Sequence, residues 1–322
     1  MKISDFNLID NLLCYYSQDV LDSLLMDRTT GRNIIWATDE YKELGDAYQP
    51  EREIKASDIA NYHSGVIKPR IVKEAARQQE RTRKKAEVFT PSWIVNKMCN
   101  AQDEAWFGYP DVFNSETESG WVTRQDPVQF PKTRNKTPLW KRYVDLRRLE
   151  ITCGEAPFIA SRYDATSGDM IPVADRIGML DRKLRIVTEN AADEKEWLEW
   201  AFRALEATYG YEFSGDNLLI ARINVFLTFA EHLQGKWNRQ MSENESRRAA
   251  RIISWNLWQM DGLTGTVPFG KAPEPADDGY YQMTLFDLLG ESEEKEEEPE
   301  DTLCRIYDWR LKASQTYVSL RD

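Results

Sequence analysis

The sequence predicts an α/β protein with a mostly parallel sheet, because segments typical of strands alternate with segments typical of helices. Residues 146–158 have the pattern of a strand, a tight turn and the start of a helix. Short apolar strands are predicted again at 209–213 and 252–260, and apolar residues at helical spacing occupy 193–208 and 218–233. Strands separated by helices form βαβ units, in which the strands run parallel.

Other elements can be predicted in order along the chain. Ile34 to Ala37 form an apolar segment between turn residues and predict a short strand. Pro91 suits the first turn of a helix that continues to about residue 107. Residues 242–251 predict a polar helix, and residues 304–309 predict a final strand. Trp255 and Trp258, three apart in a predicted strand, are expected on opposite faces of the sheet, as core residues.

Composition and pattern divide the chain into three parts. Residues 1–86 predict a mixed, largely helical N-terminal lobe that ends in a basic segment, 68–85. Residues 87–289 predict the α/β domain, with a turn-rich insertion at 108–140. Residues 290–322 predict a flexible acidic linker followed by the short strand.

Composition excludes several classes of protein. Of the 322 residues, 41% are hydrophobic and 11 are Trp, so the chain can bury a sizeable core. No apolar run reaches the roughly 20 residues that span a bilayer, and the N-terminus lacks the pattern of a secretory signal, so we expect a cytoplasmic protein without a membrane partner. The four cysteines form no CxxC pair and only two histidines exist, so we expect no metal site.

The charge of the chain is unevenly distributed. A net charge of −12 argues against a nucleic-acid partner. The segment 68–85, however, holds eight Lys or Arg against two Glu, and a local field matters more for phosphate contacts than net charge does. A solvated helix face is the usual meaning of such a run, and contact with a DNA backbone is the alternative. The candidate DNA-binding residues are Arg81, Arg83, Lys84 and Lys85.

The strongest candidate for a binding site is the turn of small residues within 150–158. A strand that leads through such a turn into a helix lets the backbone approach a ligand and offers free N–H groups, which suits an adenosyl or nucleotide ligand. An ordinary βα turn containing one Gly is the competing interpretation. The turn residues concerned are Thr152, Cys153, Gly154, Glu155 and Ala156.

Two carboxylates follow at the ends of the next two predicted strands. Glu212 could accept both ribose hydroxyls of a nucleoside, and Asp261 could accept from an adenine amino group. A solvated Glu and a turn-forming Asp before Gly are the alternatives. Ligands of open α/β sheets bind at the carboxyl ends of strands, so the order of the three features favours a binding function.

Five motifs, in order, resemble those of the N6-adenine DNA methyltransferases of restriction–modification systems, in particular proteins labelled restriction endonuclease subunit M. They are an entry motif at 87–91, a glycine motif at 149–158, a ribose-binding motif at 209–212, an Ala-Arg-x-Asn signature at 221–224 and an adenine-side motif at 256–263. The resemblance covers roughly residues 68–263 and implies a Rossmann-like, S-adenosylmethionine-dependent methyltransferase fold for the α/β domain. It implies S-adenosylmethionine as the cofactor, with Phe89, Thr90 and Pro91 added to the binding residues named above.

The chain departs from that family in two ways. Glu150 and Ala156 stand where the family commonly has Asp and a second Gly. The family's catalytic Asn- or Asp-Pro-Pro-Tyr or -Phe motif has no counterpart, since none of the 13 prolines is followed by another. That motif holds the flipped adenine, so we assign no catalytic residue.

The resemblance therefore implies a DNA adenine-N6 modification subunit that is incomplete or inactive alone, with a second subunit supplying the catalytic motif and target recognition. The alternative is a non-catalytic, methyltransferase-like scaffold or decoy that binds restriction–modification or other proteins.

Overall fold

The computed structural model describes residues 1–77, 90–131, 137–271 and 302–320. At its centre is a three-stranded parallel sheet made of β3 (Arg148–Glu150), β4 (Thr208–Glu212) and β5 (Leu257–Gln259), in that order. In this register Leu149 lies opposite Tyr209, and Tyr211 lies opposite Trp258. The protein is thus of the predicted α/β class, with the predicted parallel sheet.

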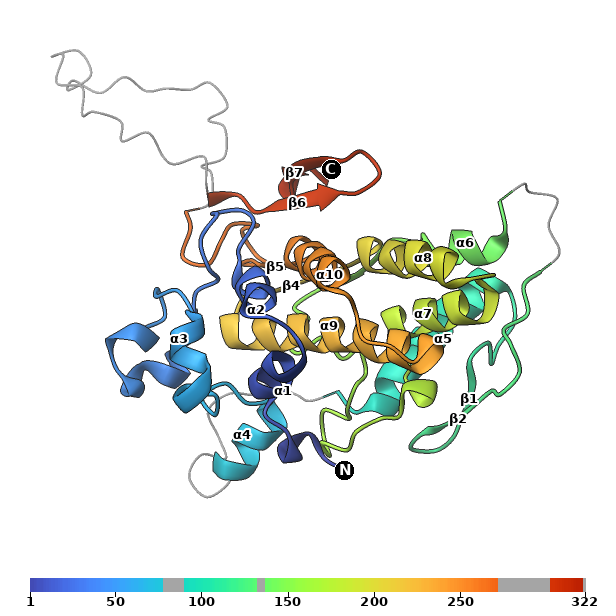
Figure 1. The fold of residues 1–322 in the computed structure, drawn as a ribbon, viewed down its shortest axis with the longest axis horizontal. Helices are drawn as coiled ribbons and strands as arrows, with labels where there is room; N and C mark the ends of the chain where they lie inside the picture. The colour runs from blue at the N-terminus through green and yellow to red at the C-terminus, as the bar shows by residue number, and fades with distance from the viewer. Residues whose placement is uncertain (78–89, 132–136, 272–301, 321–322) are drawn as a thin grey trace, which may run out of the picture.

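Helices connect the strands (Figure 1). Between β3 and β4 lie α7 (Met179–Asn190) and α8 (Glu194–Glu206), and between β4 and β5 lie α9 (Gly215–Trp237) and α10 (Glu243–Asn256). The side chains of Asp193 and Ser242 accept N–H groups at the starts of α8 and α10, which satisfies donors that a helix start leaves free. Residues 215–230 of α9 are all buried, as expected of a helix that is largely apolar around its circumference.

The N-terminal segment packs on the same core. Its helices are α1 (Leu8–Tyr15), α2 (Gln18–Leu25), α3 (Ala56–Ile59) and α4 (Arg70–Arg77). Both α1 and α2 contact α9, and α2 also packs along α10. The buried guanidinium of Arg222 on α9 donates to the carbonyls of Leu24 and Met26, and it thereby ties the end of α2 to the central helix.

The predicted strand at 34–37 is wrong, because Ile35 forms only an isolated bridge with Glu53. The side chain of Gln259 in β5 forms hydrogen bonds with the backbone N–H and carbonyl of Ile35, which a neighbouring strand would otherwise pair. Its amide oxygen accepts the Ile35 N–H at 2.9 Å, and its amide nitrogen donates to the Ile35 carbonyl at 2.8 Å. Ala37, at φ 49°, then turns the chain away.

The helix predicted after Pro91 is present as α5 (Ser92–Phe107). The turn-rich insertion contains a small antiparallel hairpin, β1 (Asn114–Glu116) and β2 (Trp121–Thr123), and α6 (Leu139–Val144) begins at its end. Among the residues that the structure describes, no helix is long and apolar enough to cross a membrane.

Two predictions near the sheet need correction. The strand expected at 252–260 covers only 257–259, because α10 continues to Asn256 and buries the apolar residues Ile252 and Ile253 in the core. Short apolar runs are ambiguous between buried helix and buried strand. Trp255 is therefore a helical residue, and its ring lies 5.4 Å from that of Tyr307, whereas Trp258 is the buried strand residue.

The helix expected to start directly after the glycine turn is absent there, because residues 151–159 form turns and the next α-helix, α7, begins only at Met179. Helix α7 itself was not predicted from the sequence, because its charged residues Asp181, Arg182 and Lys183 obscure the apolar pattern. All three are buried. The Lys183 ammonium donates to the carbonyls of Leu146 and Ala207, at 2.6 and 2.9 Å, beside the amino ends of β3 and β4. Burial lowers the pKa of Lys183 well below its usual value.

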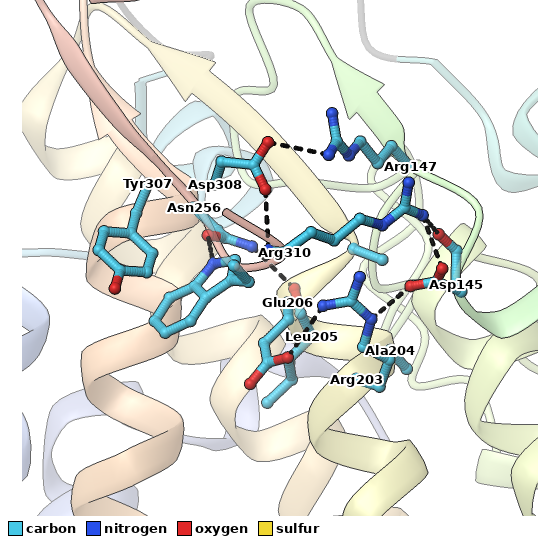
Figure 2. Close-up of polar contacts among 12 residues, drawn as sticks. Asp145, Arg147, Arg203, Ala204, Leu205, Glu206, Asn256, Tyr307, Asp308 and Arg310 are labelled. Carbon is cyan, nitrogen blue, oxygen red and sulfur yellow. Dashed lines mark hydrogen bonds and ion pairs between the residues drawn. The ribbon is translucent and has the colours of Figure 1, made fainter. Parts of the chain in front are cut away.

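The predicted final strand is β6 (Arg305–Asp308), which forms an antiparallel hairpin with β7 (Ala313–Thr316). Figure 2 shows the polar contacts beside the tip of this hairpin: Arg310 pairs with Asp145, and Arg147 pairs with Asp308. The indole of Trp309 also donates to Asn256. A second small core joins the hairpin to the sheet. It consists of Tyr211, Trp258, Met260, Cys304 and Ile306. The acidic segment 290–301 lies outside the described residues.

Candidate functional site

The turn after β3 has an unusual backbone. Thr152, Gly154 and Ala156 have φ angles of 44°, 53° and 62°, in the left-handed region that glycine tolerates and other residues enter at a cost of about 1–2 kcal/mol each. Two hydrogen bonds hold the turn: the Cys153 N–H donates to the Tyr211 carbonyl of β4, and the Ala156 N–H donates to the Cys153 carbonyl. Strained backbone of this kind is concentrated at binding sites.

Glu212, the last residue of β4, lies beside this turn. One of its carboxylate oxygens accepts the Gly154 N–H at 2.8 Å, and the other accepts the Ser214 N–H at 3.1 Å. Burial raises the pKa of the Glu212 carboxyl above its usual value, although both N–H groups oppose that shift. The structure therefore brings together the glycine turn and the acidic residue that the sequence placed on successive strands.

Two further carboxylates accept hydrogen bonds at or beside the turn. Glu150, at the end of β3, accepts the N–H groups of Phe158 and Ile159 at 3.3 and 3.1 Å. The Glu155 carboxylate accepts from the Tyr163 hydroxyl and, at 2.5 Å, from the N–H of Arg70. Burial raises the pKa of both carboxyl groups, that of Glu150 to about 8.

The Ala-Arg-x-Asn signature has two distinct roles in the fold. The Asn224 amide donates to the Glu155 carbonyl at 3.1 Å and to the Tyr163 hydroxyl at 3.2 Å, so it supports the turn directly. Arg222 instead binds backbone carbonyls of α2, α10 and β5. Only Asn224 of this pair contributes to the candidate site.

Two cavities lie on either side of the Gly154–Glu212 hydrogen bond. Cavity A has a volume of about 460 Å³ and lies at the end of β4; cavity B has about 430 Å³ and lies along the glycine turn. Arg70 lines both. The residues of cavity A that matter here are Asp39, Glu40, Glu51, Lys73, Glu212, Phe213, Ser214, Asp216 and Phe269. Those of cavity B are Thr90, Glu150, Ile151, Thr152, Cys153, Gly154, Glu155, Phe158, Tyr163 and Asn224.

The cavities differ in character. Cavity A has an aromatic wall, with the rings of Phe213 and Phe269 5.9 Å apart and nearly perpendicular. Its charged lining residues are five carboxylates and two cations. Cavity B is lined by the turn, by polar side chains such as Glu150 and Asn224, and by apolar side chains, of which Leu149 and Ile151 are exposed.

Asp261 is positioned differently from the other candidate residues. Its carboxylate accepts the Leu263 N–H at 2.8 Å, and its backbone bonds to Thr266 and Gly265. It lines neither cavity. In this arrangement Asp261 forms a turn, which is the alternative that the Asp-Gly sequence allows.

Among the entry-motif residues, Thr90 lines cavity B and Pro91 precedes the first residue of α5. Ala156, at the end of the turn, is buried and lines neither cavity, whereas Thr152, Cys153, Gly154 and Glu155 all line cavity B. Phe89 and the candidate DNA-binding residues Arg81, Arg83, Lys84 and Lys85 lie outside the described residues. Within the described ranges no group of three or more His, Cys, Asp or Glu could hold a metal ion.

A charged cluster beside cavity A was not predicted from the sequence. Lys73 of α4 pairs with Asp216 at the start of α9 and lies 3.4 Å from Glu40, and the Tyr41 hydroxyl donates to Asp216 at 2.7 Å. The Lys73 and Asp216 side chains are 9% and 3% exposed. Nothing in the local sequence pairs residues 73 and 216, so no sequence signal could have found the cluster.

Comparison with known proteins gave no match to any family model, any curated protein or any solved structure.

Proposed function

We propose that this chain binds S-adenosylmethionine at the carboxyl ends of β3 and β4, as the cofactor-binding part of a DNA adenine-N6 methyltransferase with a Rossmann-like domain. The observation that carries the proposal is the hydrogen bond between the Gly154 N–H and the Glu212 carboxylate. This bond joins the glycine turn, which lines cavity B, to Glu212 at the end of β4, which lines cavity A. Ligands of parallel α/β sheets bind at this edge.

The chemistry of the lining suits this ligand. A carboxylate has about four acceptor sites, so Glu212 can accept ribose hydroxyls in addition to its two backbone N–H groups. Phe213 and Phe269 offer aromatic contact for the adenine ring. Thr152 to Glu155 and Thr90 would surround the methionine part in cavity B. Asp261 lines neither cavity, so we leave it out of the proposed ligand-binding set.

The charge of cavity A also favours S-adenosylmethionine over phosphorylated nucleotides. With five carboxylates against two cations, the lining residues repel a polyphosphate, whereas the nucleoside part of S-adenosylmethionine carries no phosphate. When bound, S-adenosylmethionine supplies the methyl group that such enzymes transfer to adenine N6.

We propose that a second subunit supplies the residues that bind the target adenine and recognise the DNA sequence. No Pro–Pro pair occurs in the chain, so its own residues do not supply the motif that holds a flipped adenine. The same observation favours the second candidate function, a methyltransferase-like scaffold or decoy that binds restriction–modification proteins without catalysis.

Calorimetric titration with S-adenosylmethionine tests the proposal. We expect binding by the wild-type chain and a loss of about ten- to a hundredfold in affinity for Glu212→Gln, since a hydrogen bond to a charged group contributes about 1.5–3 kcal/mol. Glu206→Gln is the matched control, because Glu206 lies on α8, pairs with Arg203 and lines neither cavity. A folded wild-type chain that binds no ligand at millimolar concentration would refute the cofactor assignment and leave the scaffold as the better candidate.

A methyl-transfer assay with DNA provides a second, separate measurement on the same purified protein. The purified chain alone is expected to transfer none, and a catalytic partner recovered from the host is expected to restore transfer. Methylation of DNA by the chain alone would contradict the two-subunit proposal, even if the cofactor binds as expected.

A further inference from the structure

Arg70 occupies the junction between the two cavities. It is the first residue of α4, and it lines both cavity A and cavity B. Its backbone N–H donates to the Glu155 carboxylate in the glycine turn at 2.5 Å. The start of α4 is therefore attached to the same turn that would surround the ligand.

A second contact fixes α4 one turn further on. Lys73 pairs with Asp216, next to the first residue of α9, and lies 3.4 Å from Glu40. Its ammonium also lies 5.0 Å from the centre of the Tyr41 ring. Since Lys73 and Asp216 are almost fully buried, this pair is costly to break, and it holds α4 against the strand ends.

The charges lining the cavities identify Arg70 as the candidate partner for an anionic group. Among the described residues that line cavity B, which include Glu150 and Glu155, it is the only cation. In cavity A the other cation is Lys73, whose buried ammonium holds α4 in place. A guanidinium also matches a carboxylate in geometry, because it can donate two parallel hydrogen bonds.

We propose that Arg70 binds the carboxylate of the amino-acid part of the ligand, so that one elongated, zwitterionic nucleoside lies across both cavities. This inference rests on the proposed function, and it adds a specific partner for the carboxylate of the ligand. The nucleoside lies in cavity A against Glu212 and Phe213, and the amino-acid part passes Arg70 into cavity B along Gly154. The Lys73–Asp216 pair is a positioning contact that sets the place of Arg70.

A double-mutant cycle between protein and ligand tests the proposal. One partner is varied by comparing S-adenosylmethionine with its decarboxylated analogue, and the other by comparing wild type with Arg70→Ala. For each protein we take the ratio of its affinities for S-adenosylmethionine and for the decarboxylated analogue. We expect this ratio to be about ten- to a hundredfold larger in wild type than in Arg70→Ala, because only wild type offers the charged hydrogen bonds to the carboxylate. Arg70→Lys, which keeps the charge but loses the two-pronged geometry, should lie between the two.

The controls separate the possible outcomes. Arg32→Ala removes an exposed arginine that lines neither cavity, and it should retain the wild-type preference. Equal preference in wild type and Arg70→Ala would overturn the role of Arg70 while leaving cofactor binding intact. If neither ligand binds folded wild type, the proposed function fails and this inference fails with it.

The comparison of the two ligands on wild type needs no variant, so it remains informative if Arg70→Ala does not fold. In that case Arg70→Gln provides the second protein for the cycle, since its amide can still fill part of the arginine's space. A wild-type protein that binds the decarboxylated analogue tenfold more tightly than S-adenosylmethionine would overturn the proposal without any variant.

Discussion

Glu150 combines a buried position with a hydrogen-bonding role at the end of β3. Its carboxylate accepts from Phe158 and Ile159, and its side chain lines cavity B. Loss of hydration raises the pKa of this group to about 8, from a usual value of 4.5. A carboxyl group with a raised pKa in the folded state makes the free energy of unfolding depend on pH.

The direction of that dependence follows from proton counting. Below pH 4.5 the group is protonated in both states and contributes no slope. Between pH 4.5 and about 8 the unfolded chain ionises while the folded protein keeps the proton, so the Glu150 contribution to stability falls as pH rises. The slope approaches about 1.4 kcal/mol per pH unit in the middle of that window.

Replacing this glutamate tests the effect. Urea unfolding of wild type and Glu150→Gln at pH 5, 6, 7 and 8 is expected to show a weaker decline in stability for the variant. The control is Glu104→Gln, an exposed glutamate on α5, which should follow wild type. Parallel curves for wild type and Glu150→Gln would show that this carboxyl does not titrate in the window.

At the scale of elements, the start of α9 is held against the N-terminal segment by close backbone contact. The Gly215 N–H donates to the Trp36 carbonyl at 2.9 Å. A Cβ at Gly215 would lie 1.9 Å from the carbonyl oxygen of Ile35, so any larger residue forces the two segments apart. The same contact places Ser214 and Asp216 at the edge of cavity A.

Two alanine substitutions in this one helix should have opposite effects. Gly215→Ala is expected to destabilise the protein by about 1–3 kcal/mol or more, the usual cost of overpacking, because the obstructing atom is backbone. Gly235→Ala, where nothing lies within 4 Å of the added Cβ, should stabilise by about 0.5–1 kcal/mol through helix propensity. Urea midpoints measure both, and a Gly215→Ala variant as stable as wild type would contradict the close approach of Ile35 to this helix.

At the scale of the whole molecule, Arg222 connects parts of the chain that are far apart in sequence. Its guanidinium is fully buried and donates to the carbonyls of Leu24, Met26, Ser254 and Leu257. The N-terminal helices, α10 and β5 therefore share one buried donor. Burial lowers the pKa of Arg222 to about 9.

Removing this donor should affect the whole molecule at once. Arg222→Met is expected to cost more than about 3 kcal/mol, because several buried carbonyls lose their partner together. Tryptophan fluorescence and circular dichroism should report one shared transition, shifted to lower urea. Arg142→Met, an exposed position on α6, is the control. A variant in which only one of the two signals shifts would indicate that the N-terminal helices unfold separately.

The sequence alone determined the features that depend on neighbouring residues. Apolar spacing located α5, α8 and α9, and the alternation of strands and helices predicted the parallel sheet. The glycine turn and Glu212 were identifiable because each directly follows its strand, and parallel strands bring their carboxyl ends to one edge. The local pattern is sufficient here, because two neighbouring parallel strands necessarily bring the residues that follow them to the same edge of the sheet.

Only the tertiary structure decided the rest. It showed that 252–256 is helical, that Asp261 caps its own turn, and that α4 lies between the cavities through Arg70 and Lys73. Lys73 and Asp216 are 143 residues apart, and the burial that makes their pair strong exists only in the folded chain. Contacts over such separations depend on the packing of whole elements, so no local pattern in the sequence encodes them.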